Sequence, residues 1–248
     1  MDSLLYSLLA GSSTAIGALI SMIFKAPGKK TMATLLGFAG GIMIALSVFE
    51  LMPEALILGN LTSVAIGFIA GCVMIYAVDS MLPHAHMSSN GNLDIENGNN
   101  TSAANKSVLR TGYLIFLGIA IHNIPEGLAI GAGIQASPEL GLSIALAIGL
   151  HNVPEGLAVS GPLRAGGLSA LKVFIFTLGA GLMTVVGTAI GLLVFNISPT
   201  LISGSLAFAA GAMIYIVNDE LIPQANNLSN HSSIIGLVLG LLIGFSLL

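Results

Sequence analysis

The chain has 248 residues, of which 55% are hydrophobic and only 7% charged, and its formal net charge is −4. Because soluble domains carry about 25% charged residues, this composition excludes a large water-facing surface and predicts an integral membrane protein built from α-helices. The single cysteine, Cys72, excludes a disulfide framework and a thiolate metal cluster. We expect residues 1–248 to form one transmembrane domain.

Eight apolar stretches are long enough to cross a bilayer as helices. Most of the connections between them are short. The exception, 83–108, is polar and rich in Asn and Gly, so we expect a flexible loop there. The predicted helices span residues 3–24, 31–52, 61–82, 109–133, 139–160, 168–195, 200–222 and 232–248.

All seven basic residues fall in alternate connections between the predicted helices. Because cytoplasmic loops carry an excess of Lys and Arg, these connections, including the 83–108 loop, are predicted to be cytoplasmic. With eight helices, both termini then lie outside. The basic residues are Lys25, Lys29, Lys30, Lys106, Arg110, Arg164 and Lys172.

The second predicted helix shares a sequence pattern with the seventh. Residues 38–56 match residues 208–226 without a gap, so one constant offset relates the two copies. Under the predicted topology these two helices run in opposite directions, and so do the fourth and fifth helices. The sequence therefore predicts a 3+2+3 arrangement, in which two groups of three helices form an inverted repeat around a central pair. Such repeats are typical of transporters, with the site near the middle of the membrane.

Four polar residues lie near the predicted membrane faces. The topology places Glu50 near the outer face and Glu220 near the inner face. Each is either a station at which a cation enters or leaves, or an anchor for a helix end that the following proline terminates. His84 and His86, in the cytoplasmic loop, either collect or release a metal or belong to an ordinary solvated loop.

One hexapeptide occurs twice, in the fourth and in the fifth predicted helix. Residues 122–127 read His-Asn-Ile-Pro-Glu-Gly, and residues 151–156 read His-Asn-Val-Pro-Glu-Gly. Since residues four apart lie one turn apart on the same helix face, the His and Glu of each copy point the same way. The proline cannot donate a backbone N–H, so a carbonyl one turn before it becomes a free acceptor. We expect this loosened backbone and the two side chains to form a cation site.

Glu126 and Glu155 are costly inside a membrane without a partner. Because every Lys and Arg lies in a connection, either a proton or a bound cation has to neutralise them. A protonated Glu that bonds to a neighbouring helix is one interpretation. The matched His and Asn neighbours in both copies favour the other, a metal site with His122 and His151 as ligands.

The available donors narrow the choice of metal. Imidazole nitrogen with carboxylate and amide oxygen, and no thiolate, suits Zn²⁺, Mn²⁺, Fe²⁺, Co²⁺ or Cd²⁺ better than Cu(I), Ca²⁺ or Mg²⁺. The amides are those of Asn123 and Asn152, which otherwise cap the broken helical turns. We expect the metal to be cargo, with the bilayer as surroundings, no catalytic cofactor and no nucleic-acid partner.

These features together resemble the ZIP family of divalent metal transporters. The resemblance is carried by the two His-Asn-x-Pro-Glu-Gly motifs in helices four and five of eight, the outside termini and the His-containing loop. The run 156–162, Gly-Leu-Ala-Val-Ser-Gly-Pro, is most similar to the bacterial zinc-uptake branch of the family. It implies a multi-pass protein of the bacterial inner membrane that moves zinc, and also iron, manganese, cobalt or cadmium, toward the cytoplasm. A homodimer is compatible with the resemblance.

The resemblance also implies a central site for one or two metals. Where many family members read Gly-Leu-x-Glu-Pro-x-Gly in the sixth helix, this chain has Thr184 in place of the carboxylate. We therefore expect any second metal to be held weakly. The residues implied are His122, Asn123, Glu126, His151, Asn152 and Glu155.

Two other functions compete with metal transport. A membrane zinc metallohydrolase holds a zinc-bound water with His and Glu, but its His-Glu-x-x-His pattern is absent from this sequence. A proton-linked carrier of organic solutes uses buried acids, but no intramembrane Lys or Arg is predicted here to hold an anion. Inverted symmetry favours a transporter, because it provides access from both sides of the membrane.

Overall fold

The computed structural model describes residues 2–23, 27–81, 85–87, 93–95, 104–194 and 198–247. In these ranges the chain is helical apart from short turns and one two-stranded hairpin. Seven helical stretches are long and apolar enough to cross a membrane, and the last of them, Pro199–Leu247, covers both the seventh and the eighth predicted helices. The prediction of an all-α, multi-pass membrane protein is therefore confirmed.

The elements follow the predicted apolar stretches closely. The long helices are α1 (Asp2–Ile23), α2 (Lys29–Ala45), α4 (Leu61–Met81), α5 (Ala104–Ala136), α6 (Pro138–Ala165), α7 (Ala170–Val194), α8 (Pro199–Ile216) and α9 (Ile222–Leu247). The short elements are the π-helical segments η1 (Leu46–Leu51) and η2 (Val217–Leu221), helix α3 (Met52–Leu58) and strands β1 (Ala85–Met87) and β2 (Leu93–Ile95).

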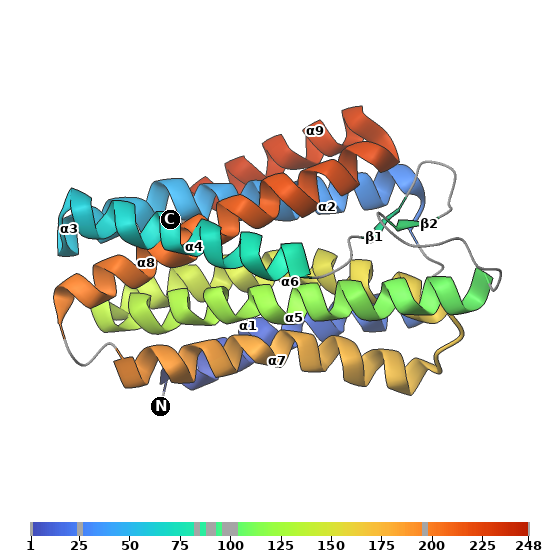
Figure 1. Cartoon of the computed structure of the whole chain (residues 1–248), viewed down its shortest axis with the longest axis horizontal. Coiled ribbons are helices and arrows are strands. Elements are labelled where there is room, and N and C mark those ends of the chain that lie inside the picture. Colours follow the sequence, from blue (N-terminus) through green and yellow to red (C-terminus); the bar gives the residue numbers. More distant parts are fainter. Residues whose placement is uncertain are drawn as a thin grey trace.

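The helices form three layers, with α5 and α6 in the middle (Figure 1). On one side of this pair, α1 packs against α6 and α7 packs against α5. On the other side, α2 contacts α6 and α8 contacts α5, while α9 packs on α2 and α4 packs on α8. Both hexapeptides therefore lie in the layer that the other helices cover.

Successive helices reverse direction, so their ends gather at two ends of the molecule (Figure 1). The turn before α6 and the turn before α8 lie at the same end as both chain termini. Both turns begin the next helix with a serine cap: Ser137 and Ser198 accept hydrogen bonds from the backbone N–H groups of Leu140 and Leu201. The opposite end holds the first residues of α2, α5 and α7 and the last residues of α6.

Two helices continue where the sequence predicted that a proline ends them. In η1 the N–H of Met52 donates to the carbonyl of Ser47, five residues back, and Pro53 then follows inside the first turn of α3. At the corresponding position of the repeat, η2 leads into α9, which bends at Ser229 (φ −170°, ψ 104°). The chain stays helical because proline fits the first turn of a new helix, where its missing N–H is not needed.

The predicted loop 83–108 contains more regular structure than expected. Strand β1 pairs antiparallel with β2, with Ala85 opposite Ile95, and α5 begins at Ala104. Helix α5 therefore begins before the apolar stretch that predicted it. His84 lies outside the described residues, and of His86 only the backbone, in β1, is described. That this segment is flexible and cytoplasmic stays a prediction.

Candidate metal centre

The two hexapeptides lie on neighbouring helices in the middle layer. Helix α5 carries residues 122–127 and α6 carries residues 151–156, and both remain α-helical through Pro125 and Pro154. The expectation of broken turns is therefore wrong. Membrane helices tolerate proline where neighbouring helices support the backbone, and α5 and α6 are packed on both sides. Each proline still deprives the carbonyl one turn before it of its α-helical donor.

Each histidine faces the glutamate of the other hexapeptide. His151 Nε2 lies 3.0 Å from Glu126 Oε1, and His122 Nε2 lies 3.5 Å from Glu155 Oε2. All four side chains are buried, with at most 3% of any residue exposed. The spacing in sequence indicated that His and Glu share a face within one copy. The structure adds that the closest pairs form between the copies and join α5 to α6.

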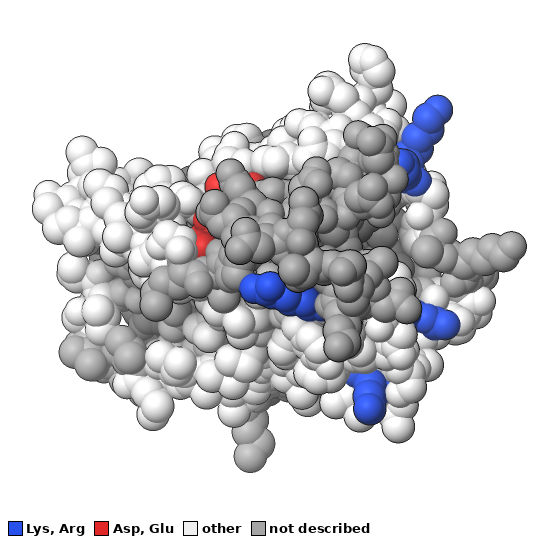
Figure 2. Space-filling model, turned by 45° about the vertical axis from the view of Figure 1, so that its right-hand side comes forward, with Lys and Arg blue, Asp and Glu red and all other residues white. Residues whose placement is uncertain are grey.

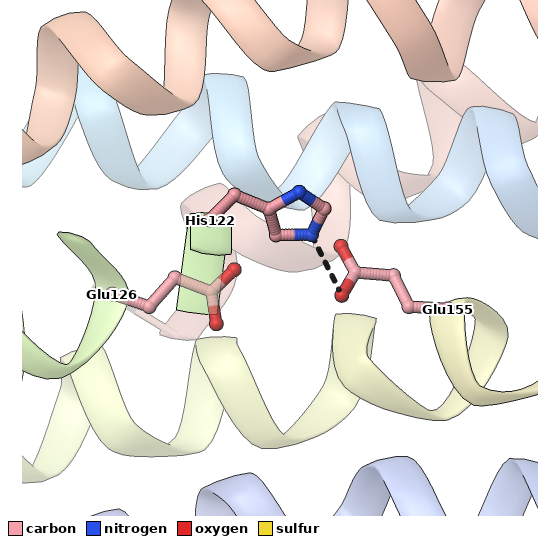
Figure 3. A group of neighbouring side chains, drawn as sticks. All are labelled: His122, Glu126 and Glu155. Atoms are coloured by element: carbon pink, nitrogen blue, oxygen red, sulfur yellow. Dashed lines mark hydrogen bonds and ion pairs between the residues drawn. The ribbon is translucent and has the colours of Figure 1, made fainter. Parts of the chain in front are cut away.

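Within the described part of the chain, three of these residues could jointly hold a metal ion. One ligand atom each of His122, Glu126 and Glu155 lies within 4.8 Å of the other two. Figure 3 shows the two carboxylates converging on the imidazole, Glu126 from α5 and Glu155 from α6. Glu126 Oε2 and Glu155 Oε1 are buried and have no hydrogen-bond partner. A cation between the carboxylates would satisfy both oxygens.

The two asparagines are held by backbone carbonyls of the outer helices. Asn123 Nδ2 donates to the carbonyl of Ala180 in α7 over 2.9 Å, and Asn152 Nδ2 donates to the carbonyl of Ala10 in α1 over 3.1 Å. Both residues are 0% exposed, and their Oδ1 atoms have no partner. Because the helices are continuous, neither asparagine caps a broken turn. Each amide instead links an inner helix to an outer one.

The glycine that ends each hexapeptide lets an outer helix approach closely. A Cβ on Gly127 would collide with the carbonyl of Thr184 in α7, and a Cβ on Gly156 would collide with the carbonyl of Thr14 in α1. This approach allows the asparagines to reach α1 and α7. Sequence reasoning gave these glycines no role, although their place directly after each glutamate was a signal.

Thr184 lies where the family pattern supplies a carboxylate. It is fully buried, and its hydroxyl has no hydrogen-bond partner. Thr14 has the same two properties, and it corresponds to Thr184 by the offset that relates 38–56 to 208–226. Sequence analysis missed Thr14, and the repeat offset applied to Thr184 would have found it. The two outer helices thus each bury an unpaired hydroxyl where α1 and α7 meet, Thr14 beside Gly181 and Thr184 beside Gly11.

Glu50 and Glu220 do not join the central group. Glu220 lines a cavity of about 20 Å³ together with His122, Gly118 and Asp79. This cavity lies on the side of His122 from which α5 begins. Glu50 lines a separate pocket of about 500 Å³ near the first turn of α6, where its carboxylate accepts a hydrogen bond from Ser143 over 3.1 Å.

Comparison with known proteins agrees with this geometry. Residues 84–248 match the family model described as ZIP zinc transporter. The chain belongs to the ZIP family. Three curated relatives of this ZIP chain are each 36% identical to it over 251 residues, covering 98% of this chain and 95% of the relative. These relatives are the zinc transporters ZupT of Escherichia coli O7:K1 (strain IAI39), strain K12 (DH10B) and O157:H7 (strain EC4115).

Proposed function

We propose that this ZIP protein carries divalent transition-metal ions, chiefly zinc, across the bacterial inner membrane toward the cytoplasm through the site between α5 and α6. Its family consists of zinc transporters, so the chain is a transporter and not an enzyme. One observation supports this metal site most directly. Glu126 and Glu155 are buried side by side, and each has one carboxylate oxygen near an imidazole and one without a partner. A divalent cation supplies the missing counter-charge.

The donor set supports a transition metal as cargo. His122 and His151 offer nitrogen, the two glutamates offer carboxylate oxygen, and the unpaired amide oxygens of Asn123 and Asn152 extend the set. Such a mixture suits zinc, iron, manganese, cobalt and cadmium, whereas Ca²⁺ and Mg²⁺ prefer oxygen alone.

We also propose that the chain crosses the membrane eight times. The stretch Pro199–Leu247 has 49 residues and bends at Ser229. As a straight helix it would be roughly 70 Å long, more than twice the hydrocarbon core of about 30 Å. Two spans joined near Ser229 account for its length.

The packing supports an inverted 3+2+3 repeat. Helix α1 packs on α6 as α7 packs on α5, and α2 packs on α9 as α8 packs on α4. The offset that relates 38–56 to 208–226 also relates the two π-helical segments. It further relates Ala10 to Ala180, the two carbonyls that hold the asparagines. Two separate regions of the chain, residues 38–56 with their π-helical segment and Ala10 in α1, thus repeat with the same spacing.

The distribution of charge supports an orientation with both termini outside. The described basic side chains belong to the first turns of α2 and α7, the second turn of α5 and the last turn of α6, all at one end of the molecule. Figure 2, in which that end comes forward, shows Lys and Arg around it. By the positive-inside rule this end faces the cytoplasm. The pocket with Glu50 then opens outside, where metal enters, and the cavity with Glu220 lies on the exit side.

Uptake into proteoliposomes tests the proposal. Purified protein is reconstituted and offered Zn²⁺, Mn²⁺, Fe²⁺, Co²⁺, Cd²⁺ or Mg²⁺, with and without a pH gradient. Unmodified protein should accumulate zinc with no other solute present, and Glu126→Ala and Glu155→Ala should each abolish uptake while the protein still inserts. His231→Ala, which removes an exposed imidazole of α9, is the control. Near-normal zinc uptake by both glutamate variants would contradict the assignment.

A further inference from the structure

We propose that Gly118 sets the width of the passage through which the metal leaves the central site. This inference rests on the proposed transport of divalent metal. Gly118 lies one turn before His122 on the same face of α5. Both residues line the cavity of about 20 Å³ that also contains Glu220. The cavity therefore begins at a residue of the central site and extends toward the basic end of the molecule.

The space at Gly118 exists because this residue lacks a side chain. A Cβ added there would meet no backbone, and its nearest neighbour would be Glu220 Oε1 at 3.7 Å. The added atom would thus project between α5 and η2, into the space that connects His122 with Glu220. Many other helical glycines in this protein face backbone of a neighbouring helix instead, as Gly127 does. Close packing does not explain the glycine at position 118.

The opposite side of the site differs at the matching position. Gly118 lies one turn before the His of the first hexapeptide, and Ala147 lies one turn before the His of the second, so the two positions correspond. Ala147 is 0% exposed, and its carbonyl lies 3.0 Å from His151 Nδ1, which fixes that ring against its own helix. The other ring nitrogen of His151 faces Glu126. The ring of His151 is thus held at both nitrogens, whereas the ring of His122 borders the cavity that begins at Gly118.

The size of the cavity restricts what can pass. About 20 Å³ holds roughly one water molecule. A divalent ion therefore crosses this space without its full hydration shell, with donors such as the Glu220 carboxylate in place of water. Mg²⁺ gives up its water reluctantly. The passage at Gly118 therefore adds a second selection for transition metals, independent of the ligands of the central site.

Release of bound zinc from purified protein tests this role. The variants are Gly118→Ala, which fits without a clash, and Gly118→Leu, which fills the cavity. The matched control is Gly161→Leu on α6, because a Cβ on Gly161 meets nothing within 4 Å. Zinc content should equal that of unmodified protein in all three variants. Loss of zinc to excess chelator, and uptake by proteoliposomes, should be slower by about tenfold or more in Gly118→Leu, less so in Gly118→Ala, and unchanged in the control.

Two results would overturn the role of Gly118. One is unchanged zinc release and uptake in Gly118→Leu. The other is loss of bound zinc in both Gly118 variants, which would assign the residue to the binding site or to folding. The proposed function fails separately, because it fails if unmodified protein moves no metal at all. Equal zinc uptake by unmodified protein and by Gly118→Leu would support the proposed transport and contradict only the role of Gly118.

Discussion

Glu126 and Glu155 each have one carboxylate oxygen that is paired and one that is not. One carboxylate oxygen of each lies against an imidazole of the neighbouring helix, which keeps the side chain in place. The other oxygen is buried without a partner, and leaving such an atom unsatisfied costs about 1–3 kcal/mol or more. The site is thus held in shape before a metal arrives, while the unpaired oxygens favour binding.

We expect the hydroxyl of Thr184 to limit this site to one metal. The central carboxylates, Glu126 and Glu155, carry two negative charges at most, enough to balance one divalent ion. Replacement of Thr184 by Glu adds a third carboxylate next to α5, and a carboxylate attracts a divalent ion far more strongly than a hydroxyl does. Thr184→Glu should therefore raise the zinc content of purified protein from one ion toward two and slow release. Metal analysis of purified protein measures the first effect, and chelator-induced release measures the second.

The size of the new side chain is controlled by Thr184→Gln, which has the same shape without the charge. Thr184→Gln should keep one zinc ion per protein. Its rate of zinc release then gives the effect of side-chain size alone, without the added charge. Two equally tight zinc ions in unmodified protein would contradict the expectation. So would equal zinc content in the Glu and Gln variants, which would mean that position 184 does not face the metal.

At the scale of the helices, α1 and α7 hold α5 and α6 by the same contacts on each side. An asparagine of the inner helix donates to a carbonyl of the outer helix, and a glycine of the inner helix allows the approach. On one side Thr188 also donates to the carbonyl of Gly127 over 2.9 Å. In each of these bonds a side chain donates to a backbone carbonyl of the neighbouring helix. No hydrophobic force holds helices together in lipid, so close contact is the main source of their association.

Replacing Gly127 or Gly156 by Ala should therefore weaken both folding and zinc binding. The added methyl collides with a carbonyl of the neighbouring helix, and overpacking of this kind costs about 1–3 kcal/mol. The displaced helix also takes away the acceptor that orients Asn123 or Asn152. Thermal unfolding in detergent, with and without zinc, should show a lower Tm and a smaller shift on zinc addition. Gly179→Ala on α7, where nothing lies within 4 Å, is the matched control and should keep both values.

The sequence predicted the helices well because hydrophobicity along a chain is a local property. Helices α1, α4 and α7 begin and end within two residues of the predicted ranges. The bend at Ser229 falls in the predicted connection between residues 222 and 232, but the helical continuation through Pro53 and Pro223 was not predicted, since packing against other helices decides whether a chain stays helical at such points. The same limit applies to the site. Spacing placed His and Glu on one face of each helix, but the pairing between copies depends on how α5 and α6 are rotated against each other.

At the scale of the molecule, the Lys and Arg residues distinguish one end of the helix bundle from the other. The central pair α5 and α6 is joined by a short turn at the end that carries both termini, while their other ends carry Arg110 and Arg164. On the proposed route, metal enters at the pocket with Glu50, leaves by the cavity with Glu220, and so moves toward the basic end. Transport toward the cytoplasm requires that the basic end be inside.

Thiol labelling of intact cells tests this orientation. In a Cys72→Ser background, Gln135→Cys places an exposed thiol at the end of α5, and Ser169→Cys places one in the connection from α6 to α7. A membrane-impermeant thiol reagent should label the first and not the second, because the basic end faces the cytoplasm. After permeabilisation both should react, which shows that neither thiol is hidden. Labelling of Ser169→Cys alone would reverse the orientation and exchange the roles of the Glu50 pocket and the Glu220 cavity. Labelling of both in intact cells would contradict a single crossing of the membrane by α6.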